Sequence, residues 1–234
     1  MQTKILGGGN IQPGTEAVVD PLYGSMRVVQ KPLDYTWANQ VLGHYAIAAP
    51  TGITVSIGAA GILSYLRNSD TSRFIVIEKV RVQAVIASTI TTGVVVDVGL
   101  KVSRGATAAG SGGTLPTVGG NNQKLRVSMG ASLVTDVRFA TTGALVRPTG
   151  ATVDSNALAY YLTPLSFNIQ SPGTATFVPA SCPPFDLYKW DANSEHPIVL
   201  SPGEVLEVQE ITAGPTTGGI QWGITYEWAE VVVF

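Results

Sequence analysis

The residues best suited to binding a metal ion are the two histidines, His44 and His196. A metal-binding barrel would supply a His-x-His pair with further Glu or His ligands, because several donors must converge on the ion from adjacent strands. Here each histidine stands alone, His44 at the start of an apolar run and His196 before Pro197, which holds it extended. We therefore expect structural, hydrogen-bonded histidines and no metal site.

A second arrangement of oxygen side chains occurs at Asp191, Asn193 and Glu195, whose alternation is typical of loops that encircle Ca²⁺. An EF-hand loop needs glycine at its sixth position, and that position is His196 here. We expect an ordinary Asx-turn loop, with calcium binding as the open alternative.

The chain shows no nucleophile with a partner. Cys182 lies in Ser-Cys-Pro-Pro, a predicted loop with no base or cation beside it in the sequence, so we expect a packing residue. The pairs Glu204 with Glu207 and Glu227 with Glu230 resemble the two acids of a glycosidase, but acids on strands are typically solvated, and we expect that here. Neither a Gly-x-Ser-x-Gly elbow nor a phosphate-binding loop occurs. The sequence therefore predicts no enzyme and no cofactor.

Charge and hydropathy argue against several further classes of protein. Lys and Arg total 14 against 16 for Asp and Glu, with no basic run, so a nucleic-acid partner is not expected. The segment from Val41 to Leu66 carries no Asp, Glu, Lys or Arg, but Pro50, Gly52, Gly58 and Gly61 interrupt its interior. Its apolar residues also alternate as in a strand, which argues against a membrane helix. The first ten residues lack the apolar segment of a signal peptide, so no export is expected. A single cysteine excludes an internal disulfide and suits a reducing cytoplasm.

Alternating apolar residues predict several strands. The runs from Val94 to Val102 and from Val80 to Ile86 alternate apolar with polar residues, as in strands with one face in the core and one in solvent. Near the C-terminus Trp222, Ile224, Tyr226 and Trp228 share one face of a longer strand, which predicts the aromatic centre of the core.

Turn and loop signals separate these strands. Ser103–Asn122 and Ser171–Pro184 are rich in Gly, Ser, Thr or Pro and predict long loops, and Ser201-Pro-Gly-Glu204 predicts a type II turn. Many strands without βαβ spacing favour an all-β fold, a two-sheet antiparallel sandwich of jelly-roll type, with an immunoglobulin-like sandwich as the rival.

Residues 1–40 differ from the rest and predict an extended N-terminal arm before a jelly-roll-like domain at 41–234. A glycine-rich opening is followed by turns, a short strand and apolar residues without a sandwich repeat. We expect these to pack on the domain or on a neighbouring protein, and they are the candidate interaction residues: Leu22, Tyr23, Met26, Val28 and Trp37.

With these segments in hand, the chain resembles a group of structural proteins of tailed bacteriophages. The matching words are DPLYGSMRVVQKP from Asp20, GHYAIA from Gly43, NNQKLRVSMGASLVTDVR from Asn121, HPIVLSPGE from His196 and YEWAEV from Tyr226. They span nearly the whole chain. The resemblance implies a virion component of β-sandwich type and brings no catalytic residues with it.

The function expected from this resemblance is that of a capsid decoration or cement protein, made in the host cytoplasm and located on the capsid surface. Such a protein would bind the major capsid protein through its arm and loops and stabilise the head. A chain with few charged residues has little electrostatic repulsion between its copies. We therefore expect a symmetric homo-oligomer, a homotrimer. The alternatives are a fibre, collar or tail-associated adhesin that binds host glycan and a carbohydrate-active enzyme.

Overall fold

The computed structural model describes residues 41–88, 90, 96–116, 124–125, 130–162, 181–191 and 196–232. The chain divides into two compact units, Met1–Asp34 and Tyr35–Phe234, and every described residue belongs to the second. The expected arm, residues 1–40, and its candidate interaction residues Leu22, Tyr23, Met26, Val28 and Trp37 lie outside the described residues.

The described part of the chain is built of β-strands and turns, so the all-β expectation is confirmed. The strands are β1 (Val41–Thr54), β2 (Gly61–Arg67), β3 (Phe74–Ser88), β4 (Asp97–Arg104), β5 (Asp136–Phe139), β6 (Thr152–Val153), β7 (Ala159–Leu162), β8 (Ser181–Lys189), β9 (Ile198–Leu200), β10 (Val205–Glu210) and β11 (Gly219–Val231). Over these residues, no helix is long and apolar enough to cross a membrane.

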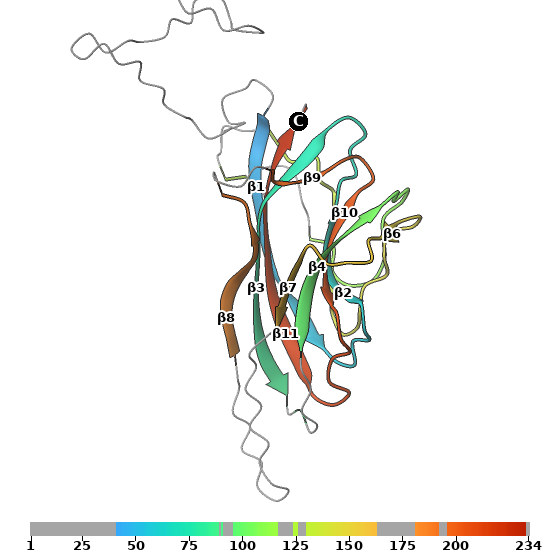
Figure 1. Cartoon of the computed structure of the whole chain (residues 1–234), viewed down its shortest axis with the longest axis vertical. Coiled ribbons are helices and arrows are strands. Elements are labelled where there is room, and N and C mark those ends of the chain that lie inside the picture. Colours follow the sequence, from blue (N-terminus) through green and yellow to red (C-terminus); the bar gives the residue numbers. More distant parts are fainter. Residues whose placement is uncertain are drawn as a thin grey trace, which may run out of the picture. The chain divides into compact units, whose positions relative to one another are not determined.

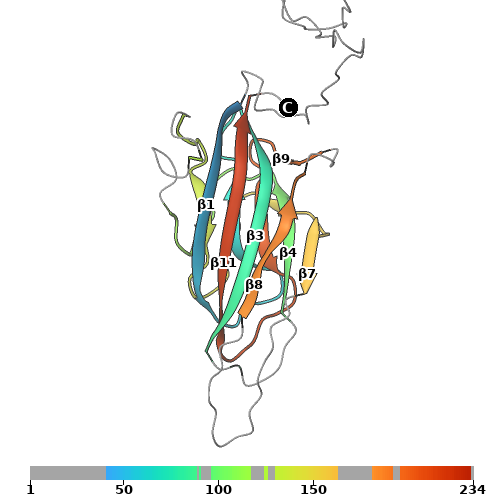
Figure 2. The same cartoon turned by 90° about the vertical axis from the view of Figure 1, so that its left-hand side faces the viewer.

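The strands form two antiparallel sheets, which confirms a β-sandwich (Figure 1). Sheet I has the order β1-β11-β3-β8, with the short β9 paired to β3 beyond the end of β8. Sheet II has the order β5-β2-β10-β4-β6, with β7 also paired to β4. Figure 2 shows sheet I face on, with its long strands β1, β11 and β3 side by side.

The strand pairs are nested in the sequence. β4 pairs with β7, β3 with β8, β2 with β10, and β1 with β11, so each pair encloses the previous one along the chain. Successive pairs alternate between the sheets, since β1–β11 and β3–β8 lie in sheet I while β2–β10 and β4–β7 lie in sheet II. These four pairs contain eight of the described strands, and β5, β6 and β9 pair outside them, with β2, β4 and β3.

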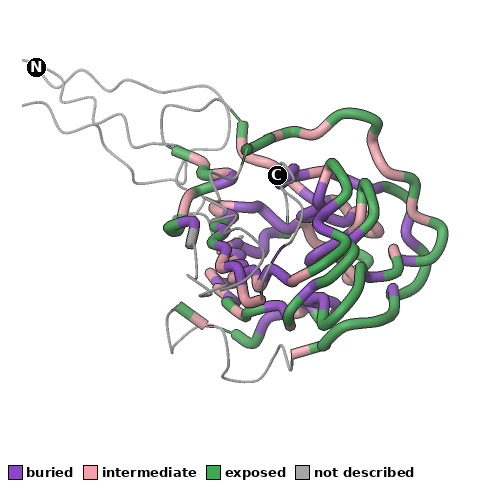
Figure 3. The backbone as a smooth tube through the Cα atoms, turned by 90° about the horizontal axis from the view of Figure 1, so that it is seen from below, coloured by how far each residue is buried: buried purple, intermediate pink, exposed green. Residues whose placement is uncertain are grey.

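The core lies between the sheets, and its centre is the aromatic face predicted on β11. Trp222, Ile224, Tyr226 and Trp228 are each at most 1% exposed. The ring of Trp228 stacks on that of Tyr45 from β1, with 5.7 Å between ring centroids. In Figure 3 the purple, buried stretches of backbone lie within the sandwich and the green, exposed ones run around it. The prediction of an aromatic centre is confirmed.

The inner faces of β3 and β4 also agree with the alternation, since Val80, Val82, Val98 and Leu100 are fully buried. The outer face of β4 does not. Asp97 and Ser103, near opposite ends of that face, are at most 1% exposed, although this face was expected to meet solvent.

Asp97 is enclosed by Thr212, whose N–H and hydroxyl donate to it, and by Tyr160, whose hydroxyl donates to its other oxygen. A loop also lies against sheet II. Ser103–Asn122 was predicted to be a long loop; Ser103 and Arg104 belong to β4 instead, and 105–116 contains no strand and is held to the sheet by backbone hydrogen bonds. Thr114 and Phe139 exchange backbone hydrogen bonds of 2.8 and 3.0 Å, and Ser111 exchanges two with Val146. The prediction of a long loop is confirmed for 105–116, and residues 117–122 lie outside the described residues.

The predicted loop around Cys182 is a strand. Ser181–Lys189 forms β8 at the edge of sheet I, where Ala84 pairs with Cys182 but Val82 pairs with Phe185. This irregular register places Pro183 and Pro184 in a bulge, the position in a sheet edge that tolerates residues without an N–H group. Cys182 is 3% exposed and burial raises the pKa of its thiol, so the packing role is confirmed and the loop is wrong.

The predicted turn at Ser201–Glu204 is present. Gly203 has φ of 78°, and the Glu204 N–H donates to the Ser201 carbonyl over 3.0 Å. The turn connects β9 of sheet I to β10 of sheet II, so this short corner carries the chain from one layer to the other.

Candidate functional site

The two histidines are not brought into a metal site. His44 Nδ1 lies 2.8 Å from a carboxylate oxygen of Glu78, which confirms a hydrogen-bonded structural role. His196 is exposed before β9. Among the described residues no group of three or more His, Cys, Asp or Glu side chains could hold a metal ion. Residues 192–195 of the possible calcium loop lie outside the described residues.

Glu207, one of the paired acids, is fully buried rather than solvated. It faces outward from β10 beneath the cover of sheet II. The guanidinium of Arg147 donates to both carboxylate oxygens of Glu207, over 2.9 and 3.1 Å. The Ser103 hydroxyl and the Gln209 amide donate to the same carboxylate. Through these bonds Glu207 holds the segment that carries Arg147 against sheet II.

The second pair is also structural. Glu230 is 2% exposed and accepts hydrogen bonds from the Ser132 hydroxyl (2.5 Å) and the Leu133 N–H (3.0 Å), which hold the segment before β5. Glu227 lies on the outer face of sheet I, 2.8 Å from Lys79. The expectation of solvated acids is wrong for Glu207 and Glu230. Strand alternation could not reveal this, because the covering segments come from elsewhere in the chain.

A third buried acid, Glu210, was not singled out from the sequence. It points into the core from the end of β10, is 1% exposed, and accepts a hydrogen bond of 3.2 Å from the indole N–H of Trp222. Its other oxygen, Oε2, faces Gly214 and has no hydrogen-bond partner among the described residues. Burial, opposed by the Trp222 bond and helped by the charge of Asp97, raises the pKa of Glu210 to about 7.

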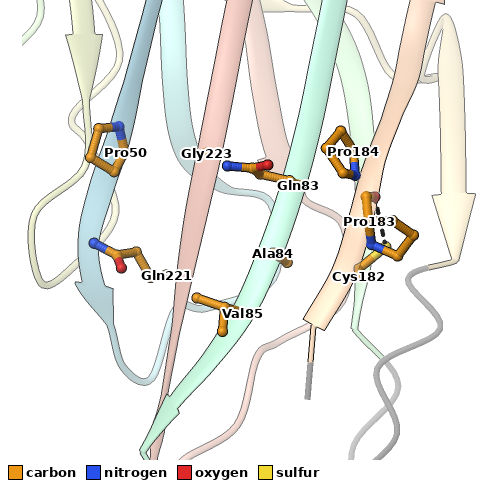
Figure 4. Close-up of a pocket in the computed structure, with 9 residues that line it drawn as sticks. All are labelled: Pro50, Gln83, Ala84, Val85, Cys182, Pro183, Pro184, Gln221 and Gly223. Carbon is orange, nitrogen blue, oxygen red and sulfur yellow. Dashed lines mark hydrogen bonds between the residues drawn. The ribbon is translucent and has the colours of Figure 1, made fainter. Parts of the chain in front are cut away.

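The outer face of sheet I carries a hollow of about 310 Å³ that spans β1, β11, β3 and β8 (Figure 4). Its lining contains no charged and no aromatic side chain: Pro50, Gln83, Ala84, Val85, Cys182, Pro183, Pro184, Gln221 and Gly223. Two side-chain amides provide its polar groups, and the prolines stand on the two outer strands.

Gly223 shapes this hollow. It is paired with Gln83 on one side and Pro50 on the other. A Cβ atom at position 223 would lie 2.6 Å from the Gln83 amide nitrogen, so the side chain of Gln83 lies across β11 only because residue 223 has none. The Gln221 amide nitrogen donates to the Thr51 carbonyl over 3.0 Å, which fixes the orientation of that amide.

A strip of exposed apolar side chains lies on and beside β7, the short strand at one edge of sheet II. Leu158, Tyr160 and Leu162 alternate along the chain and are 56%, 52% and 57% exposed. The Tyr160 hydroxyl donates to the buried Asp97. Its neighbour Tyr161 stacks on Phe185 of β8 with 3.9 Å between ring centroids, which joins the two sheets at this edge. We call Leu158, Tyr160 and Leu162 the β7 strip.

No family model, curated protein or solved structure matches the chain.

Proposed function

We propose that the chain is a structural protein of a tailed-bacteriophage virion, a decoration or cement protein that binds the major capsid protein and stabilises the head. Two lines of argument support this. The matching words of the sequence span nearly the whole chain, and the buried Glu207 and Glu230 of the described sandwich bind segments of the chain itself.

The proposal includes a jelly-roll topology for the sandwich. The nested pairs β4–β7, β3–β8, β2–β10 and β1–β11, alternating between the two sheets, are the pattern that a folded-over hairpin makes when it wraps into a jelly roll. This architecture is frequent in viral capsid proteins and in lectins. A fold does not define a function, so the surface has to carry the argument further.

The observation that carries the proposal is the β7 strip. Its three side chains are more than half exposed and form an apolar surface without a charge of its own; Tyr160 and Leu162 lie on the edge strand β7, and Leu158 lies just before it. Exposed apolar residues that cluster in this way mark contacts with other proteins, and sheet edges are the places where another chain adds most easily. The strip is therefore where we place the contact with the major capsid protein.

Self-association accompanies this role in the proposal. A homotrimer seated on the capsid surface would present three β7 strips at once, so that three weak contacts combine through effective concentration. The mass of the isolated protein in solution tests the trimer.

A binding experiment with purified heads tests the proposal. The double variant Leu158→Asp/Leu162→Asp places two charges on the strip, and Val232→Asp, which changes another exposed apolar residue near the C-terminus, is the matched control. Co-sedimentation with heads assembled from the major capsid protein of the virion measures binding. We expect the natural chain and the control to bind and the double variant to bind at least about tenfold more weakly.

Two results would count against the proposal. Binding of the double variant at full strength would remove the strip from the contact. Failure of the natural chain to bind heads would remove the decoration role itself. Circular dichroism of the double variant has to show a folded sandwich.

A further inference from the structure

The hollow on the outer face of sheet I has an uncharged lining. None of its lining residues is charged, and the nearest charges on that face are already neutralised, Lys79 by Glu227 and Arg81 by Asp186, each over 2.8 Å. A ligand with a net charge would find no counter-ion in the hollow and would lose hydration on entering it.

Its hydrogen-bonding groups are side-chain amides. The backbone N–H and C=O groups of β11 are used in the ladders to β1 and β3, so Gln83 and Gln221 are the groups that can bind a ligand from the sheet face. An amide offers both a donor and an acceptor, and neighbouring hydroxyl groups on one ring need this combination. The hydrogen bond to Thr51 fixes the Gln221 amide, and the space above Gly223 accommodates the Gln83 side chain. Both amides are therefore in position before a ligand binds.

The walls are apolar. Pro50 on β1 and the pair Pro183–Pro184 on β8 stand on opposite sides of the Gln83 amide, and the Gln221 amide lies on the Pro50 side (Figure 4). The volume of about 310 Å³ lies at the lower end of the range for small-ligand pockets. A peptide would gain main-chain hydrogen bonds at a free sheet edge, and this hollow lies on a sheet face instead. We propose that it binds one or two rings of an uncharged saccharide, with hydroxyls on the two amides and the carbon skeleton against the prolines.

This inference is independent of the capsid role, since it concerns a different face of the sandwich. The test uses the full chain on an array of neutral oligosaccharides, followed by titration calorimetry with the best ligand. Gln83→Leu keeps the size of the side chain and removes the amide. Thr225→Val is the matched control, because Thr225 follows Gly223 on the same face of β11.

We expect saccharide binding by the natural chain and by Thr225→Val, and at least about a tenfold loss of affinity in Gln83→Leu with an unchanged melting temperature. Binding to no member of the array would overturn the proposal. So would equal affinity of Gln83→Leu and the natural chain, or binding of peptides from a display library with no saccharide binding.

Discussion

Replacing Glu210 by Gln tests whether an ionisable group buried in the core makes the stability of this protein depend on pH. Glu210 is 1% exposed, and one of its oxygens accepts the Trp222 N–H while the other has no partner among the described residues. Gln has nearly the same size and can accept the same hydrogen bond, but it never carries a charge. The substitution thus removes titration and little else.

The sign follows from the direction of the pKa change. Burial raises the pKa of Glu210 from its ordinary value of 4.5 to about 7 in the folded protein. Between these values the folded state binds a proton that the unfolded chain has lost, so stability falls as the pH rises through this window. One pKa unit corresponds to about 1.4 kcal/mol, and the loss between pH 4.5 and pH 7 therefore amounts to about 3 kcal/mol.

Urea unfolding between about pH 4 and pH 8 measures this effect. We expect the natural chain and Glu210→Gln to be about equally stable at the acidic end, and the variant to be more stable by up to about 3 kcal/mol at the alkaline end. Glu227→Gln, at a partly exposed ion pair with Lys79, is the control and should shift stability by at most about 1 kcal/mol over the whole range. Parallel curves for the natural chain and Glu210→Gln would refute the reasoning.

Three further substitutions or deletions test the account. Trp222→Ala should lower the free energy of unfolding by about 3–5 kcal/mol in urea titrations, and a loss below about 1 kcal/mol would contradict a place at the centre of the core. Arg147→Met should cost about 3–5 kcal/mol because it leaves the charge of Glu207 buried without its cation, and adding Glu207→Gln should recover part of that loss; no recovery would show that the pairing is not the cause. Deleting residues 1–30 should leave a folded domain by circular dichroism that no longer joins particles, and an unfolded product would show that this segment belongs to the core.

Much of the sandwich was predictable, because strand alternation reports directly on which face of a strand meets the core. The prediction holds for β3 and for the aromatic face of β11, where packing between the sheets decides the residue types. It fails at the end of β1, where Ile53 is 44% exposed and Thr54 is 2% exposed. The register between Pro50 and Ile53 is irregular, and such a shift exchanges the two faces of a strand without any signal in the alternation itself.

The surface features were less predictable. The burial of Glu207 and Glu230 depends on segments that cover the sheets from distant parts of the sequence, and local patterns do not report tertiary cover. The hollow depends on Gly223 lying between Gln83 and Pro50, which requires the strand register of three strands at once. The exposed alternation of Leu158, Tyr160 and Leu162 is a signal that sequence inspection could have used, since an apolar run beside a short strand marks either a core or a contact edge.

Imaging of the intact virion by electron cryomicroscopy tests the central claim most directly. The account predicts the sandwich on the outer surface of the head at a regular site of the capsid lattice, in many copies per particle, grouped in threes, with the β7 strip against the major capsid protein. Density for this chain on the tail, collar or fibres and its absence from the head would contradict the decoration role.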